Sequence, residues 1–110
     1  MATERLKKLN DLLRDEVGKI LKKELELNDV LVTVVRADIS PTLEHATVWI
    51  SVFPESQEKS ALKEINGKIY SLQQMLNKRL VMRPVPKIRF AIDKTEEGAA
   101  RIEQLIDTTR

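Results

Sequence analysis

The sequence contains no cysteine, a single histidine and three glycines among its 110 residues. Without cysteine, the chain can form neither a disulfide framework nor a thiolate metal site, which suits a reducing cytoplasm. One histidine and three glycines cannot assemble a Ser-His-acid triad, a histidine-rich metal site or a glycine-rich phosphate loop. These absences predict a protein that is not an enzyme and needs no metal or cofactor.

Long apolar runs are also missing. No stretch approaches the roughly 20 apolar residues that span a bilayer. The segment Met1–Arg5 leads into a charged region and not into the apolar core of a signal peptide. We therefore expect a soluble, cytoplasmic protein with no membrane partner.

The charge, by contrast, is abundant and unevenly placed. The whole chain carries a formal net charge of +2, yet seven basic residues and one acid lie between Lys68 and Lys94, a local charge of +6. Such segregation gives a positive surface that attracts a polyanion without raising self-repulsion elsewhere. Nucleic acid is the first partner to consider, although charge alone is equally consistent with a solvated surface.

Aromatic residues are too few for base stacking along a sheet. The chain has Trp49, Phe53, Tyr70 and Phe90, and Phe90 alternates with apolar residues that are expected in the core. Proteins that bind single-stranded nucleic acid on the surface of a β-sheet present a row of such rings. Any RNA would therefore be recognised by its shape and backbone, while Trp49 either covers the second face of the sheet or marks a partner surface.

Hydrophobic periodicity predicts one domain over residues 1–110 with the element order α-β-β-αα-β-α. The expected elements are a helix over 4–27, strands over 30–40 and 46–53, a helix pair between Pro54 and Pro84 that is broken at Asn66-Gly67, a strand over 87–92 and a short helix over about 95–107. The tight turn at 40–44 makes the first two strands antiparallel, and the helical crossover permits a parallel third strand. The expected fold class is α+β, with a small three-stranded mixed sheet and helices on one face.

Three acidic residues are the candidates for a catalytic carboxylate. Asp38, Glu44 and Asp93 lie at strand ends or near turns, where carboxylates ordinarily cap backbone groups or face solvent. The lone His45 has no second ligand with which to share a metal. None of these residues predicts catalysis.

Two segments resemble a known family. The run Val32–Val52, with Asp38-Ile39-Ser40-Pro41-Thr42-Leu43 at its turn, resembles the hairpin of ribosome-binding factor A, a bacterial assembly factor of the small ribosomal subunit. The run Leu76–Phe90, with Arg83-Pro84-Val85-Pro86, is similar to the second signature of that family. The resemblance covers nearly the whole chain. It implies a type II K-homology-like fold, a monomer that binds the rRNA of the immature small subunit, a role in late maturation and rRNA processing, and importance in cold adaptation.

The resemblance leaves the position of one feature open. Members of the family have an Ala-x-Gly kink between the two central helices in place of the Gly-x-x-Gly loop of K-homology domains. Counting back from Val85-Pro86 without a gap places the kink at Lys68-Ile69-Tyr70, whereas Gly67 lies one turn earlier. A helix corner with no ligand is the simplest role for Gly67, and close approach of its backbone to a phosphate would be an added one.

The candidate RNA-binding residues combine the basic run, the helix corner and the first helix. They are Asn66, Gly67, Lys68, Lys78, Arg79, Arg83, Lys87, Arg89, Arg14, Lys22 and Lys23. Two other functions stay open: a generic K-homology-like domain that binds some other RNA, and a protein-interaction module that uses the sheet surface around Trp49 and Phe53.

Overall fold

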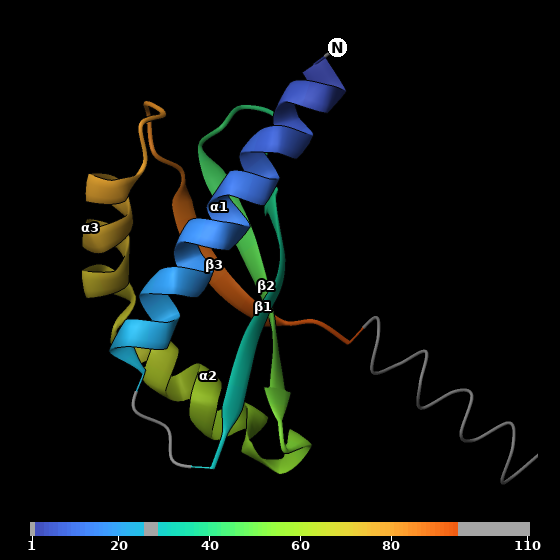
Figure 1. Cartoon of the computed structure of the whole chain (residues 1–110), viewed down its shortest axis with the longest axis vertical. Coiled ribbons are helices and arrows are strands. Elements are labelled where there is room, and N and C mark those ends of the chain that lie inside the picture. The colour runs from blue at the N-terminus through green and yellow to red at the C-terminus, as the bar shows by residue number, and fades with distance from the viewer. Residues whose placement is uncertain (1, 26–28, 95–110) are drawn as a thin grey trace, which may run out of the picture.

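The computed structural model describes residues 2–25 and 29–94. Its elements are α1 (Ala2–Glu24), β1 (Leu31–Ile39), β2 (His45–Phe53), a 3₁₀ turn (Glu55–Gln57), α2 (Glu58–Gly67), α3 (Ile69–Arg79) and β3 (Lys87–Ile92) (Figure 1). The predicted order of elements is confirmed over this range. The expected last helix, over about 95–107, lies outside the described residues.

The three strands form one mixed sheet in the order β1-β2-β3. β1 and β2 are antiparallel, with Val32 opposite Val52, and β2 and β3 are parallel, with Val48 opposite Phe90. The parallel pair is possible because α2 and α3 carry the chain back to the starting end of β2. A register shift between Val34 and Arg36 bends β1 at a bulge.

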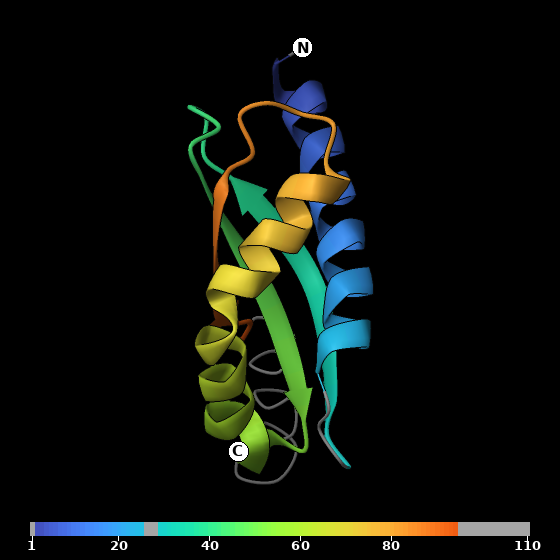
Figure 2. The ribbon, with the colours of Figure 1, turned by 90° about the vertical axis from the view of Figure 1, so that its left-hand side faces the viewer.

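All three helices pack against one face of the sheet (Figure 2). Alternate residues of β2 point into this layer, and Val48 and Ile50 are fully buried. The helices contribute Leu13, Val17, Ile65, Leu72 and Leu76 to the same core. The opposite side of the sheet, which we call the open face, is covered by no helix among the described residues. The α+β class and the one-sided helix layer are thus confirmed.

The predicted amphipathic character of α1 is also confirmed. Leu13, Val17 and Ile20 recur at helical spacing and are almost completely buried. Burying each of these side chains contributes about 1.5–3 kcal/mol relative to leaving it in water. No helix in the described ranges is both long and apolar enough to cross a membrane.

The corner between the central helices falls at the boundary of Gly67 and Lys68. Gly67 is the last residue of α2, and Lys68, with φ −108° and ψ 10°, separates it from α3. A Cβ added to Gly67 would meet nothing within 4 Å, and no glycine among the described residues has a positive φ. The corner therefore does not depend on the conformational freedom of glycine.

The open face is partly covered by its own side chains. The Arg36 guanidinium lies 4.7 Å from the centre of the Trp49 ring, and the indole Nε1 of Trp49 donates to Asp38 at 2.9 Å. Trp49 thus covers the second face of the sheet, which is one of its two expected roles. Asp93 was expected to cap a backbone group or to face solvent, and the second alternative is wrong: its side chain is 3% exposed and accepts a hydrogen bond from Arg36 at 2.7 Å. No local pattern indicates this pair, because its members are 57 residues apart.

Candidate nucleic-acid interface

The fold divides the predicted RNA-binding residues between two faces of the molecule. Ile88 and Phe90 point into the core, so their neighbours Lys87 and Arg89 lie on the open face. The other nine lie on α1, on α2 and α3, at the corner between these two helices, or in the segment that follows α3. The expectation of one continuous basic face over the helix pair and the third strand is therefore corrected to two separate basic surfaces. The reason is that successive side chains of a strand point to opposite faces of the sheet.

The corner between α2 and α3 exposes backbone and fixes one cation. Asn66 and Gly67 are exposed. Lys68 is half-buried, and its Nζ donates to the carbonyl oxygen of Glu24 at 2.8 Å and lies 3.7 Å from a carboxylate oxygen of Glu64. An ammonium group at this place satisfies a free carbonyl at the C-terminal end of α1 and complements the helix dipole. Lys68 thus joins α1 to the corner, while Asn66 and Gly67 leave the backbone of the corner exposed.

The end of α3 carries one paired and one unpaired cation. Nε of Arg79 donates to Oε1 of Glu16 on α1 at 2.7 Å. This hydrogen bond lowers the pKa of Glu16 below its ordinary value, and Lys19 acts in the same direction against an opposing effect of burial. Lys78 is exposed and has no partner among the described residues. Of the two, Lys78 is the one whose charge is available to a phosphate.

Arg83 binds backbone carbonyl oxygens of the turn after α3, which its place in the basic run did not predict. Its Nη1 donates to the carbonyl oxygens of Leu80 at 2.7 Å and Met82 at 2.8 Å, and its Nη2 donates to that of Asn77 at 3.4 Å. Carbonyl oxygens leave the positive charge of the guanidinium uncompensated. Arg83 therefore shapes the turn after α3 and still contributes a positive charge to its surface.

The three predicted cations of α1 point in two directions. Lys23 follows Glu16 by two helical turns and so lies on the side of α1 that meets α3. Arg14 and Lys22 instead line a groove between α1 and β1. Arg14 is paired with Asp11 at 3.6 Å and Asp15 at 3.1 Å, whereas Lys22 has no partner in the part of the chain that the structure describes.

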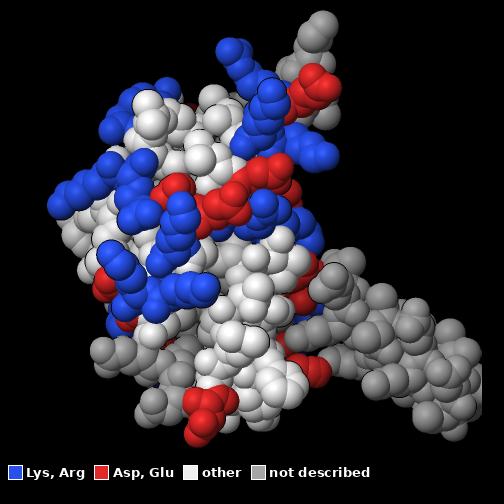
Figure 3. Space-filling model, in the orientation of Figure 1, with Lys and Arg blue, Asp and Glu red and all other residues white. Residues whose placement is uncertain are grey.

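Figure 3 shows how these charges are distributed on the face that carries α1 and α3. Lysine and arginine side chains gather over both helices, with acidic side chains between them. Because several arginines are held by neighbouring carboxylates or carbonyls, the unpaired lysines supply much of the charge that can meet an incoming anion. The candidate interface on this face consists of the end of α3, the exposed corner and the adjoining side of α1, which together we call the helical surface.

Two side-chain amides with structural roles were missed at the level of sequence. Gln73 on α3 accepts from the N–H of Ile88 at 2.9 Å and donates to the carbonyl of Pro86 at 3.0 Å, so it anchors the start of β3. Asn10 on α1 accepts from the N–H of Ile39 at 2.8 Å, at the end of β1. Polar residues on amphipathic helices usually face solvent, so the sequence carried no signal for either contact.

No group of three or more His, Cys, Asp or Glu side chains that could hold a metal lies within residues 2–25 and 29–94. The structure instead presents a basic helical surface on a three-stranded α+β fold. These features define a small K-homology-like α+β protein with a basic helical surface. The particular family follows from comparison with known proteins.

The family model for ribosome-binding factor A matches residues 5–106. A ribosome-binding factor A from Coxiella burnetii is 33% identical over 108 residues, which cover 96% of this chain and 89% of the relative. The crystal structure of the Thermus thermophilus ribosome-binding factor A superposes with a TM-score of 0.68 at 24% identity, covering 77% of this chain and 91% of that one. A homology model of the Thermus thermophilus protein, fitted into a cryo-EM map of its complex with the 30S subunit, gives a TM-score of 0.70 at 23% identity and covers 81% of this chain and 96% of that one. This chain belongs to the ribosome-binding factor A family.

Proposed function

We propose that this protein is a non-catalytic biogenesis factor that binds the rRNA of the immature small ribosomal subunit and assists its late maturation and rRNA processing in the cytoplasm. The observation that carries the proposal is the family match over residues 5–106. The Thermus thermophilus relative in a complex with the 30S subunit supports the choice of partner. The helical surface supplies the charge that such a partner requires.

The helical surface suits contact with an RNA backbone better than reading of bases. Lys78 offers an exposed ammonium group at the end of α3, and Lys23 offers a second one on α1. The exposed Asn66-Gly67 corner adds backbone that a phosphate can approach closely, since Gly67 has no side chain. Tyr70, 75% exposed near the same corner, is the one aromatic ring on α3. A surface with several cations and one ring positions RNA by shape and charge.

The proposed role needs neither a catalytic group nor a cofactor. A protein that binds one conformation of an rRNA segment more tightly than another shifts the population toward the bound conformation. Thermodynamic linkage then requires that the mature arrangement of the subunit weaken binding of the factor. The protein would thus promote maturation by differential affinity and leave once maturation is complete.

The decisive experiment measures binding of the purified protein to precursor and mature small subunits over a series of salt concentrations. Neutralising roughly four to seven phosphates predicts a log-log slope of about −3 to −6. Tight binding to the precursor that weakens with this slope, with weaker binding to the mature subunit, is the expected result. Equal retention on both particles, or binding that is insensitive to salt, would contradict the proposal.

Two matched charge reversals decide which surface binds. Lys78→Glu and Lys87→Glu make the same change of charge at exposed residues whose side chains have no partner in the described part of the chain, one on the helical surface and one on the open face. We expect Lys78→Glu to weaken precursor binding and to reduce the magnitude of the salt slope by about 1. Lys87→Glu should have a smaller effect. The reverse ranking would place the interface on the open face. In a separate competition experiment, unrelated structured RNA that displaces the protein equally well would indicate a general RNA-binding domain.

A further inference from the structure

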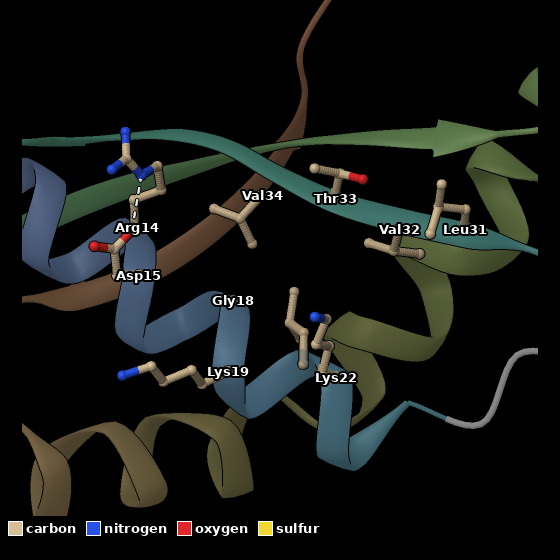
Figure 4. A pocket seen from close by; sticks show the side chains of 10 residues that line it. Arg14, Asp15, Gly18, Lys19, Lys22, Leu31, Val32, Thr33 and Val34 are labelled. Atoms are coloured by element: carbon tan, nitrogen blue, oxygen red, sulfur yellow. Dashed lines mark hydrogen bonds and ion pairs between the residues drawn. The ribbon is translucent and has the colours of Figure 1, made fainter.

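A groove runs between α1 and the outer edge of β1, away from the α3 side of α1. Its volume is about 420 Å³, within the roughly 300–1,000 Å³ of binding clefts. The wall from α1 is formed by Arg14, Asp15, Gly18, Lys19, Leu21 and Lys22, and the wall from β1 by residues 31–34. Figure 4 shows Gly18 on α1 facing the strand across this space, which we call the edge groove.

The β1 wall shows that the groove lies against the edge of the strand. A cavity on one face of a strand is lined by alternate residues, because successive side chains point to opposite faces. The edge groove is lined by four consecutive residues, Leu31 to Val34. It therefore exposes the backbone of the strand together with the side chains of Val32 and Val34.

This stretch of backbone has unused hydrogen-bonding capacity. Among the described strands β1 pairs with β2 alone, so half of its backbone N–H and C=O groups point toward the outer edge of this sheet. At two other points of the sheet edges a side-chain amide binds the backbone: Asn10 accepts from the N–H of Ile39, and Gln73 accepts from the N–H of Ile88. Among the described residues, no hydrogen bond reaches the outer edge of β1 between Leu31 and Val34. A bulge follows Val34, so the regular part of this edge ends there.

Gly18 keeps the groove open at a cost to α1. A glycine within a helix destabilises it by about 0.5–1 kcal/mol relative to alanine. A Cβ at Gly18 would meet nothing within 4 Å, so packing against the rest of the fold does not require glycine there. The missing side chain instead leaves room above Val32 and Val34 for a chain laid beside β1.

We propose that the edge groove binds an extended segment of a partner protein, in which apolar and acidic residues alternate, as a fourth strand beside Leu31–Val34. In β-strand addition, backbone hydrogen bonds supply affinity and alternate side chains supply specificity. Apolar side chains of the segment would pack between Gly18 and the valines of β1. Its acidic side chains would meet Lys22, which lines the groove and whose side chain has no partner among the described residues.

A protein segment fits this groove better than RNA does. The walls provide apolar side chains and a line of alternating backbone donors and acceptors, which an extended peptide matches and a phosphodiester backbone does not. Arg14 is paired with two aspartates, which leaves Lys22 as the only unpaired cation of the groove within the described ranges. One free cation suits an acidic side chain better than a run of phosphates. The proposal concerns a surface separate from the helical surface and goes beyond the proposed function.

The probe is a capped heptapeptide that alternates glutamate and valine, titrated into the isotopically labelled protein while backbone amide resonances are recorded. We expect shifts confined to the edge groove, from residues 31–34 and the facing turns of α1. Two N-methylated versions of the peptide, one methylated at the valine amides and one at the glutamate amides, block opposite edges of the added strand. One of them should lose binding and the other should keep it; equal binding of both would overturn strand addition.

Two pairs of variants test the walls. Gly18→Leu fills the groove and should lower peptide affinity at least tenfold, whereas Gly18→Ala, which adds only a methyl group, should change it by less than about threefold. Lys22→Glu should weaken binding, while Lys23→Glu, one residue further along and outside the groove, should not. Thermal unfolding of each variant shows that the fold is retained.

Three outcomes would overturn the proposal. The first is no binding of the peptide at millimolar concentration. The second is a hexauridylate that shifts the same amides and is blocked by Gly18→Leu, which would assign the groove to nucleic acid. The third is a concentration-dependent dimer, seen by sedimentation, that Gly18→Leu abolishes, which would make a second copy the occupant. None of these results bears on subunit binding through Lys78, so the two proposals can fail separately.

Discussion

The Arg36 guanidinium reaches across the middle strand to Asp93, with 2.7 Å between Nη1 and Oδ2. Arg36 lies on β1 and Asp93 directly follows β3, and these strands are not neighbours in the sheet. Between them the guanidinium stacks on Trp49 of β2. One side chain thus ties all three strands together on the face that no described helix covers.

Removing Arg36 should therefore destabilise the fold. Arg36→Ala removes the ion pair that Arg36 makes with Asp93, a side chain that is 3% exposed, and uncovers the Trp49 ring. We expect the free energy of unfolding in urea to fall by about 2–3 kcal/mol, less than for a fully buried pair because Arg36 is 41% exposed. Trp49 is the single tryptophan, so its fluorescence should shift toward that of a solvated indole. Arg89→Ala removes one open-face hydrogen bond, to Thr47, and should cost less than about 1 kcal/mol; an equal loss in both variants would contradict this account.

The pair of Glu16 and Arg79 predicts a small dependence of stability on pH. The folded-state pKa of Glu16 is lowered, so its contribution is fully present above the unfolded-state pKa and is lost as the pH falls through the folded-state pKa. Arg79 is 39% exposed, so we expect this contribution to be only about 0.2–1 kcal/mol. Unfolding of wild type and Glu16→Gln should differ at pH 7 and converge in acid. A difference in the free energy of unfolding that grows as the pH falls would contradict the lowered pKa of Glu16.

The same substitution should affect RNA binding in the opposite direction. Glu16→Gln removes a negative charge beside Arg79 and frees part of its positive charge for an incoming phosphate. We expect tighter binding to precursor subunits at low salt, with the gain shrinking as salt is added. Asp15→Asn makes the same change of charge on the side of α1 that lines the edge groove and should have a smaller effect. Equal effects would indicate general attraction and not a local interface.

Gly67→Ala separates the structural from the binding role of the corner. Gly67 has no positive φ, and a Cβ built on it meets nothing within 4 Å, so alanine fits without strain. Because alanine lowers the conformational entropy of the unfolded chain, it should raise the free energy of unfolding by about 0.4–1 kcal/mol. If the backbone of the corner approaches a phosphate, precursor binding should weaken although the protein is more stable. Subunit affinity that stays unchanged would reduce the corner to a turn between helices.

Arg83 should act mainly through the turn that it shapes. Arg83→Ala removes donors to the carbonyls of Leu80 and Met82, and we expect a loss of about 1–3 kcal/mol in chemical denaturation. Arg83→Lys keeps the charge but not the fork of donors, so it should recover little of this stability. Full recovery by lysine would show that charge, and not the carbonyl contacts, is the important property.

Much of the fold could be predicted because it rests on local patterns. The spacing of Leu13, Val17 and Ile20 defines the buried side of α1, and the alternation around Val48 and Ile50 defines the inner face of β2. The tight turn between the first two strands set their antiparallel pairing, and the helical crossover permitted the parallel third strand. The resemblance to the family, confirmed by the family model over residues 5–106, rested on the same two segments.

The candidate site was harder to predict, because contacts between distant residues decide which cations are free. Arg79 meets Glu16 across 63 residues, and Lys68 meets the carbonyl of Glu24 across 44. Neither pairing can be predicted from the spacing of residues along the chain. The sequence therefore did not distinguish the paired cations of the basic run from the unpaired ones. The contact of any of these residues with RNA stays a prediction.

The kinds of elements, their order, the inward side of each strand and the sign of the charge are properties of the sequence, since they follow from side-chain periodicity and composition. Other properties required the folded chain: Lys87 and Lys78 lie on different faces, Asp93 is buried beneath a network on the open face, and Gly18 stands beside a free strand edge. These facts depend on how α1, α3 and the three strands pack together in space. Packing joins residues that are far apart along the chain, and no local pattern specifies which of them meet.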